Sequence, residues 1–234
     1  MNKISCKSCP VWSKCSFQFL KEHEVHYLDE IKQTIQLNRG DFLNEKGKIV
    51  DYVYCIQSGH TKITWPDENF QKESIVKIVA PGDMTGYRCV FSEQNFRATA
   101  VAIEPVVACK IPKDFFFELL SSNIHFNLEI FKKMGSEIKK AEERLHSFTA
   151  KNVRERLAEC LIKLYELSGE ENNNQLHIKI KLTRDELASL IGTAKETVVR
   201  TLTDFKEERI IDQLDNVLII TNLEKLSNIS KNIH

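Results

Sequence analysis

The most distinctive chemistry of this chain lies in its cysteines. Seven occur among 234 residues, and three of them, Cys6, Cys9 and Cys15, lie close together near the N-terminus. Thiolates are soft ligands, and three at this spacing can wrap around one metal centre without long loops. The spacing therefore predicts a metal or redox site on a short N-terminal arm, residues 1–20, which still needs a fourth ligand.

The cysteine count also bears on the redox compartment. The number is odd, and the N-terminus has no apolar run long enough for a secretory signal, so a disulfide framework is improbable. No later segment is apolar enough to span a membrane. We expect a cytoplasmic protein that makes no membrane contact. Cys55 in a predicted strand and Cys160 on an apolar helix face have the usual setting of small buried hydrophobes.

The arm must be held by the segment that follows it. Residues 21–122 contain short β-branched and aromatic segments separated by turn glycines, such as 52–56, 62–65 and 74–79. This pattern predicts a small antiparallel barrel or roll. With the helices described next, the fold class is α+β, with the β-roll first.

A long helix is predicted next, over residues 123–148. Its apolar residues recur at alternating spacings of three and four, which draws one seam along the helix. Because the helix is long, a heptad seam between two helices, and hence a homodimer, suits it better than packing within its own domain. The seam residues are Phe131, Met134, Ile138, Ala141, Leu145 and Phe148.

The C-terminal region, residues 149–234, has the pattern of a winged helix-turn-helix. Asn152 and Glu155 have capping-box spacing, which predicts the start of a helix. The polar segment 168–175 is expected to be a loop that ends this helix. Thr183 with Glu186 and Thr193 with Glu196 then form two further capping-box patterns. Between these two lies Gly192, so we expect a helix, a tight turn and a second helix. Residues 210–214 and 216–220 follow as a hairpin, the wing.

The second helix of such a motif presents its N-terminal turns to the DNA major groove. Glu196 can accept a hydrogen bond from cytosine N4, and Arg200, four residues later on the same face, can donate to guanine O6 and N7. The alternative for such a pair is an ordinary surface ion pair. The formal net charge of the chain is zero, so the DNA-binding hypothesis depends on this motif alone. The candidate contact residues are Lys195, Glu196, Thr197, Val199 and Arg200.

The segment Glu196-Thr197-Val198-Val199-Arg200 resembles the E-T-[IV]-x-R recognition signature of the Crp/Fnr superfamily. The roll, the long helix and the winged domain resemble that family in the same order over nearly the whole chain. The resemblance implies a transcription regulator, not an enzyme, that binds a DNA palindrome as a homodimer and works with RNA polymerase. Lys195 and Val199 differ from the family pattern, which leaves the outer bases of the DNA site open.

The family's cyclic-AMP pocket is not matched here. Its G-E-L segment and R-S pair correspond to Gly86-Tyr87-Arg88 and Arg97-Ala98, which lack the ribose-binding carboxylate and the hydroxyl near the phosphate. Cyclic AMP is therefore disfavoured as the signal.

The cysteines instead resemble those of the oxygen-sensing Fnr group. Cys6, Cys9 and Cys15 match its three N-terminal cysteines in spacing, and Cys109 falls where that group has its distant cysteine. The resemblance implies a [4Fe-4S] cluster on these four residues, whose loss in oxygen changes the tendency to dimerise. Cys89, in a predicted loop, is the reserve ligand.

Ligand type alone leaves other cofactors open. Four thiolates suit a structural zinc ion equally well, and the arm could be a thiol switch or carry no ligand. A haem or small organic ligand in the roll is a further alternative. An iron-sulfur electron carrier is disfavoured, because the chain lacks a second cysteine set and a flavin or dinucleotide loop.

Overall fold

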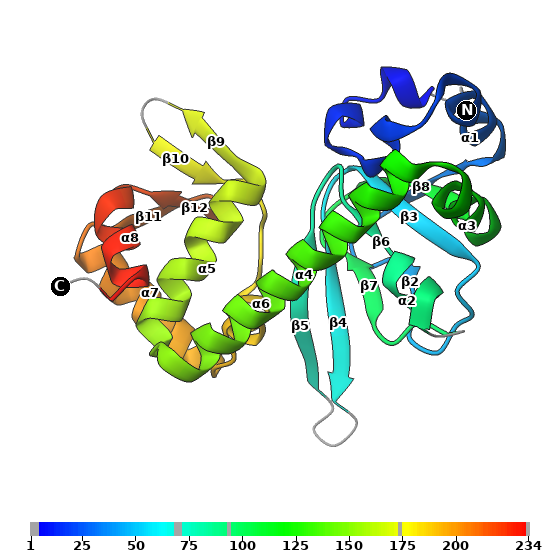
Figure 1. Ribbon diagram of the computed structural model, residues 1–234. Helices are drawn as coiled ribbons and strands as arrows, with labels where there is room; N and C mark the ends of the chain where they lie inside the picture. The colour runs from blue at the N-terminus through cyan, green and yellow to red at the C-terminus, as the bar shows by residue number, and fades with distance from the viewer. Residues whose placement is uncertain (1–4, 68–71, 93–94, 173–174, 233–234) are drawn as a thin grey trace. The chain divides into compact units, whose positions relative to one another are not determined.

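A computed structural model describes residues 5–67, 72–92, 95–172 and 175–232 of the chain. The chain divides into two compact units, Met1–Lys139 and Lys140–His234 (Figure 1). None of the described helices is sufficiently long and apolar to cross a membrane.

The first unit begins with the arm, which folds as three short 3-10 helices. They are η1 (Cys6–Ser8), η2 (Trp12–Lys14) and η3 (Ser16–Phe19). Helix α1 (Glu22–Ile31) follows and leads into the roll. The arm therefore has local structure of its own, with hydrogen bonds between residues three apart.

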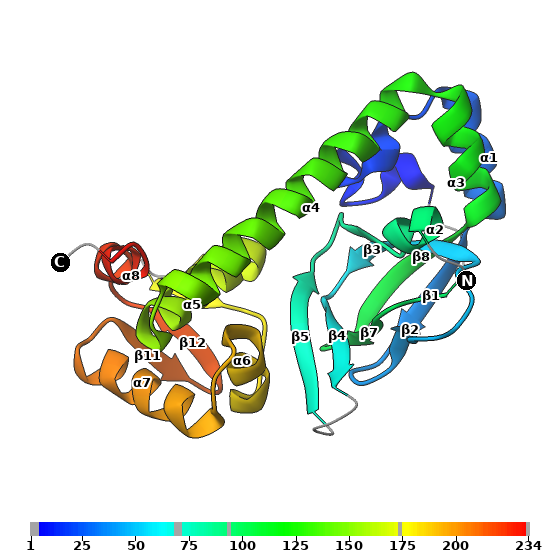
Figure 2. The ribbon, with the colours of Figure 1, turned by 60° about the horizontal axis from the view of Figure 1, so that its bottom comes forward.

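The roll consists of two antiparallel four-stranded sheets within the described residues. The first has the order β1-β8-β3-β6. The second has the order β2-β7-β4-β5 (Figure 2). Their strands are β1 (Gln33–Leu37), β2 (Phe42–Asn44), β3 (Tyr52–Ser58), β4 (Thr61–Asp67), β5 (Lys72–Val79), β6 (Met84–Thr85), β7 (Thr99–Ala102) and β8 (Val106–Pro112). The predicted strands 52–56, 62–65 and 74–79 are confirmed as parts of β3, β4 and β5.

Strand β3 lies between two apolar clusters because successive side chains of a strand point to opposite faces. Tyr54 and Ile56 point into the interior of the roll, where they pack with Phe96 and Val106. The side chains that alternate with them belong to a second cluster, which also contains residues of the arm, α1 and the helices after β8. Strand β3 thus forms part of both the roll interior and the surface beneath the arm.

Helices connect and extend the roll. They are α2 (Tyr87–Ser92), α3 (Lys113–Ser122) and the long α4 (Ile124–Ala150). The predicted helix over 123–148 is confirmed within two residues at its C-terminal end. Cys89 lies in α2, so the loop predicted for it is wrong.

Asn123 fixes the start of α4. Its side-chain oxygen accepts hydrogen bonds from the backbone N–H groups of His125 (3.1 Å) and Phe126 (3.0 Å). Its side-chain nitrogen donates to the carbonyl of Phe19 (3.2 Å) and to the Glu24 carboxylate (2.6 Å). One buried amide therefore joins the arm, α1 and α4.

The second unit is the predicted winged helix-turn-helix. Its sheet has the order β11-β12-β10-β9, and β11 and β12 form the predicted wing. The elements that follow α4 are α5 (Val153–Ser168), β9 (Gly169–Asn172), β10 (Gln175–Ile178), α6 (Arg184–Ile191), α7 (Lys195–Glu207), β11 (Ile211–Leu214), β12 (Val217–Ile220) and α8 (Leu223–Ser230).

Two local predictions in this unit are wrong. The segment 168–175 was expected to be a loop, but residues 169–172 pair with β10 as an edge strand. All four residues of β9 are exposed, so the sequence has no apolar alternation there to indicate a strand. Residues 173–174 lie outside the described residues.

The second error concerns the capping box at Thr193. Helix α7 begins one residue later than that pattern requires, and its N-cap is Ala194, which has no side-chain acceptor. The backbone N–H of Thr193 instead donates to the carbonyl of Ala188 (3.0 Å) in the turn that follows α6. The boxes at Asn152 and Thr183 are confirmed.

Candidate thiol site and nucleic-acid interface

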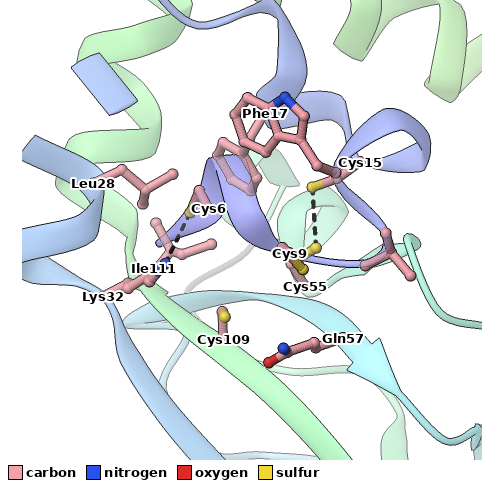
Figure 3. Close-up of a pocket in the computed structure, with 12 residues that line it drawn as sticks. Cys6, Cys9, Cys15, Phe17, Leu28, Lys32, Cys55, Gln57, Cys109 and Ile111 are labelled. Atoms are coloured by element: carbon pink, nitrogen blue, oxygen red, sulfur yellow. Dashed lines mark hydrogen bonds between the residues drawn. The ribbon is translucent and has the colours of Figure 1, made fainter. Parts of the chain in front are cut away.

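Five thiols surround one cavity between the arm and the roll (Figure 3). The four predicted ligands, Cys6, Cys9, Cys15 and Cys109, all line it, and so does Cys55. The remaining lining residues are mostly apolar, with Lys32 and Gln57 as the other polar side chains. Residues far apart in sequence are thus gathered into one thiol-rich pocket, here called the thiol cavity.

The sheet supplies two of the thiols. Cys55 on β3 and Cys109 on β8 are directly opposite each other in the antiparallel register. Cys55 lies in the core cluster beneath the arm and Cys109 packs against that cluster, which puts both on the face that the arm covers. Sequence reasoning assigned Cys55 to ordinary packing, whereas the structure places it in the wall of the site.

Cys55 could have been found from the strand pattern. It is one residue from Tyr54 and Ile56, which point into the roll, so it must point to the other face. Cys109 lies on the neighbouring strand β8, and the register between β3 and β8 decides whether Cys55 and Cys109 point to the same face of the sheet. That register depends on pairing over the whole sheet, which local sequence does not reveal.

The arm is anchored by the carboxylate of Asp29 on α1. It accepts hydrogen bonds from the hydroxyl of Ser5 (2.6 Å) and from the backbone N–H of Cys6 (2.8 Å). The ammonium group of Lys32 donates both to Asp29 (2.6 Å) and to the sulfur of Cys6 (3.0 Å). The Lys32 side chain is only 3% exposed, so this charge is held inside the site.

The protonation of these groups follows from burial and from this cation. Burial raises the pKa of Cys6 to about 12, against the opposing effect of Lys32. Burial would raise the pKa of Asp29 too, but hydrogen bonds from Lys32, Ser5 and Cys6 lower it to about 2. Burial also raises the pKa of Cys109, with Lys32 again opposing. Lys32 is the positive charge that can stabilise negative charge in the cavity.

Cys15 and Cys55 form a direct contact between thiols. Their sulfur atoms are 3.1 Å apart, and both residues are buried. The hydrogen bond between them lowers the pKa of Cys15 and raises that of Cys55. Cys15 lies between η2 and η3 of the arm, so this contact joins the arm to the sheet.

The other two cysteines lie away from the thiol cavity. Cys89, the reserve ligand, packs against the cluster in the interior of the roll. Cys160 lies in α5 of the second unit, where burial raises its pKa to about 12.

The donor set fits a polynuclear thiolate-bound cluster. In the part of the chain that the structure describes, no group of three or more His, Cys, Asp or Glu side chains is arranged to hold a metal ion. A multi-iron cluster presents a separate iron to each thiolate, so its ligands need not converge on one point. The cavity volume is about 30 Å³, so the arm must move outward to admit such a cluster.

The segments that correspond to a cyclic-nucleotide pocket are occupied by other contacts. Tyr87 is 1% exposed and packs in the core cluster beneath the arm. The Arg97 guanidinium lies 6.0 Å from the centre of the Trp65 ring. Arg88 forms an ion pair with Glu137 of α4 (3.6 Å).

The second unit presents the predicted DNA-contacting residues on α7. Lys195, Glu196, Val199 and Arg200 are exposed in its first two turns, while Thr197 is half-buried. Glu196 and Arg200 form no ion pair with each other or with another described side chain. The structure therefore does not contain the alternative, an ordinary surface ion pair between these two residues. Lys195 pairs with Asp185 of α6 (2.7 Å).

The turn between α6 and α7 fixes the orientation of that face. Gly192 ends α6 with φ of 63°, a left-handed conformation that favours glycine. Val198, Leu202 and Phe205 are buried on the other side of α7. The apolar side of α7 is therefore held against its own unit, and the polar side faces out.

The seam of α4 is only partly as predicted. Phe131, Ile138 and Leu145 are 60% to 66% exposed, and Ala141 is also exposed. Met134 packs against the core cluster of the first unit. Phe148 is 37% exposed, and its ring also contacts Arg144 and Arg156 of the second unit.

Sequence reasoning missed two further exposed apolar residues of α4. Ile124 is 65% exposed and Leu128 is 50% exposed. They precede Phe131 by seven and three residues and so extend the same stripe, here called the α4 stripe: Ile124, Leu128, Phe131, Ile138 and Leu145.

Two family models match the chain. Residues 34–123 match the cyclic nucleotide-binding domain, and residues 155–229 match the Crp-like helix-turn-helix domain. Together they cover the roll and the winged unit.

Relatives of known role align over almost the full length. The "Fumarate and nitrate reduction regulatory protein" of Yersinia pestis is 28% identical, and the alignment covers 98% of this chain and 91% of that protein. The "Anaerobic regulatory protein" of Aggregatibacter actinomycetemcomitans is 26% identical over 97% of this chain and 88% of its own length. The "Transcriptional activator protein Anr" of Pseudomonas protegens is 26% identical, with 90% and 86% covered.

Solved structures share the fold. FixK2 from Bradyrhizobium japonicum superposes with a TM-score of 0.77 at 16% identity, covering 85% of this chain and 97% of that one. The CRP-family regulator TTHB099 from Thermus thermophilus gives a TM-score of 0.73 at 15% identity, with 84% and 96% covered.

The anchor of the arm leads to a prediction. Replacing Asp29 with Ala leaves the buried Lys32 ammonium without its carboxylate, which should weaken docking of the arm by about 1 to 3 kcal/mol. Chymotrypsin should then cut faster at Phe17, which is 2% exposed when the arm is docked. The control is Lys7→Ala, which removes an exposed ion pair with Glu22 and should change the rate little. Equal cleavage rates in both variants would show that Asp29 does not hold the arm.

Proposed function

Because the chain belongs to the Crp/Fnr superfamily of transcription regulators, we propose that it binds a specific DNA palindrome as a homodimer and responds to oxygen or redox state through a [4Fe-4S] cluster. The observation that supports the sensor is the gathering of Cys6, Cys9, Cys15 and Cys109 around one cavity. The names of the relatives, which refer to anaerobic regulation and to fumarate and nitrate reduction, point to the same signal.

DNA recognition rests on the exposed N-terminal turns of α7. Glu196 accepts from cytosine N4 and Arg200 donates to guanine O6 and N7. Neither side chain forms an ion pair with another described residue. Val199 is 46% exposed and can contact only a thymine methyl group. Lys195 is positioned by Asp185 and supplies a positive charge beside the backbone phosphates.

Dimerisation rests on the α4 stripe. Large apolar side chains that are exposed at seven-residue intervals form a seam that a second copy of the helix can cover. Helix-turn-helix dimers bind two half-sites about one DNA turn apart, so a homodimer accounts for a palindromic site.

The sensing step rests on how the arm touches α4. The ring of Phe17 stacks on that of Phe126, with centroids 5.4 Å apart, and Asn123 bonds to the arm carbonyl of Phe19. A bound cluster supplies oxygen-labile iron-sulfur chemistry at the four cysteines. Lys32 stabilises negative charge there, and the position of Phe17 transmits the docking of the arm to the first turns of α4. The alternative, a structural zinc on the same thiols, leaves the DNA-binding role unchanged.

The first prediction here concerns base contacts. Arg200→Ala should cost about 1 to 3 kcal/mol at a palindrome with TGA and TCA half-sites, because a bidentate guanine contact is lost. Competition between the palindrome and random DNA at a fixed salt concentration measures the sequence-specific part of the binding free energy. Lys206→Ala is the control, because it removes the same positive charge at the far end of α7. This change should weaken binding to the palindrome and to random DNA by the same factor. Random-sequence selection that yields no palindrome would contradict the proposal.

The second prediction concerns the dimer. Ile138→Glu places a charge in the centre of the α4 stripe and should give monomers with reduced DNA affinity. Sedimentation velocity distinguishes the monomer from the dimer by mass. Lys140→Glu makes a larger change of charge on another face of the helix and should leave the dimer intact. An unchanged dimer in Ile138→Glu would locate the interface elsewhere.

The third prediction concerns the cofactor. Protein purified without oxygen should be brown, contain about four irons per monomer as a [4Fe-4S] cluster requires, and bleach in air with loss of DNA affinity. Each Cys→Ser change at positions 6, 9, 15 and 109 should abolish or cripple the cluster, whereas Cys160→Ser should not. Colourless anaerobic protein with one zinc ion, or with no metal, would refute the oxygen sensor and leave the DNA-binding proposal standing.

A further inference from the structure

The thiol cavity contains one more cysteine than a four-iron cluster needs. Cys55 is outside the predicted ligand set, yet its sulfur lies 3.1 Å from that of Cys15, a predicted ligand. Both residues are buried, at 6% and 7% exposure. The surplus thiol is therefore in contact with a ligand thiol of the arm.

We propose that Cys15 and Cys55 form a reversible disulfide when the cluster is absent, so that oxidised protein is held in a form unable to rebuild its cofactor. The pairing itself rests on the contact between the two sulfurs. Its effect on the cofactor rests on the proposed function, because it assumes that Cys15 is a cluster ligand.

The geometry requires only a small movement. A disulfide bond is about 2.0 Å long, so the sulfur atoms must approach by about 1 Å. Cys55 is held in the sheet by pairing with both Cys109 and Met84. Cys15 lies in the joint between two short 3-10 helices. The arm can therefore supply the movement while the sheet stays in place.

Cys109 is the competing partner for Cys55. The two residues are directly opposite on antiparallel strands, at a backbone separation that a disulfide can span. The two strands hold both backbones, however, and the contact between sulfur atoms is with Cys15. The structure therefore favours a bond from sheet to arm over one across the sheet.

The oxidation needs a two-electron oxidant small enough to enter. The cavity volume is about 30 Å³, whereas one water molecule needs only about 10 to 15 Å³ by this measure, so a small hydroperoxide such as hydrogen peroxide can enter. The Cys15 sulfur attacks one peroxide oxygen, the O–O bond breaks, and a sulfenic acid and water form. The Cys55 sulfur then displaces the hydroxyl group, giving the disulfide and a second water. Two thiols are oxidised and one peroxide is reduced.

The consequence concerns the order of events. While Cys15 is a ligand, its sulfur is bound to iron and cannot attack peroxide. After the cluster is lost, the disulfide removes one of the four ligands until a thiol reductant restores it. The Cys55→Ser variant has no such block.

The pairing is tested on the full-length, cluster-free chain. Treatment with hydrogen peroxide, alkylation and peptide mapping should show one cross-linked pair, Cys15 with Cys55, that dithiothreitol reverses. Cys55→Ser should give no cross-link, while Cys160→Ser, changed in the other unit, should behave as the wild type. A Cys55–Cys109 pair, or oxidation without any cross-link, would overturn the proposal.

The effect on the cofactor is tested by the initial rate of cluster formation from ferrous iron and sulfide. Peroxide treatment should slow this rate in the wild type until dithiothreitol is added, and should slow it far less in Cys55→Ser. Cys55→Ala and circular dichroism check that the variants fold. If neither variant forms a cluster before oxidation although both are folded, Cys55 is itself a ligand and the proposal is wrong. If the disulfide forms but no variant ever binds iron and sulfide, the pairing stands and the sensor proposal fails.

Discussion

The contact on which the site depends is the packing of the arm against the start of α4. Phe17 is 2% exposed and Phe126 is 0% exposed, and their rings stack while Phe116 of α3 meets Phe126 edge-on. Asn123 adds hydrogen bonds to the arm and to the first turn of α4 from the same place. Burial of such aromatic rings contributes several kcal/mol in aggregate, about 1.5 to 3 kcal/mol for each side chain. The arm is therefore part of the core of the first unit, and its cysteines are placed by that core.

This packing makes the cysteine site and the helix start parts of one structure. Cys15 precedes Phe17 by two residues, and both belong to the core cluster that also contains Ile130 of α4. Lys133 of α4 forms an ion pair with Asp83 of the roll (3.2 Å), and Lys77 pairs with Glu137 (2.7 Å). A change at the cysteines can alter α4 only through such contacts, and only if they differ in energy between the two states of the arm.

The parts that the sequence predicts well are those with local physical causes. The helix-turn-helix was placed because Thr183 caps α6 and Gly192 permits the turn, and both act within a few residues. The capping box at Thr193 is a local error, caused by the turn after α6, but other errors lie where a distant partner decides. Residues 169–172 are a strand because β10 lies beside them, and Met134 turns inward because the roll is there to receive it.

Cys55 shows the same limit at the site itself. Its chemistry is the same as that of the other cysteines, but its role depends on which face of β3 the arm covers, and this is a property of the whole first unit. The same β-strand alternation that puts Tyr54 and Ile56 into the roll puts Val53 and Cys55 beneath the arm. A cysteine at either neighbouring position would have been a packing residue of the roll. Because the sheet holds Cys55 and Cys109 while the arm carries the other three thiols, any bond formed between the two groups fixes the arm on the roll. The proposed cluster and the proposed disulfide would be two ways of making that connection, and they would differ in how closely the arm must approach the sheet.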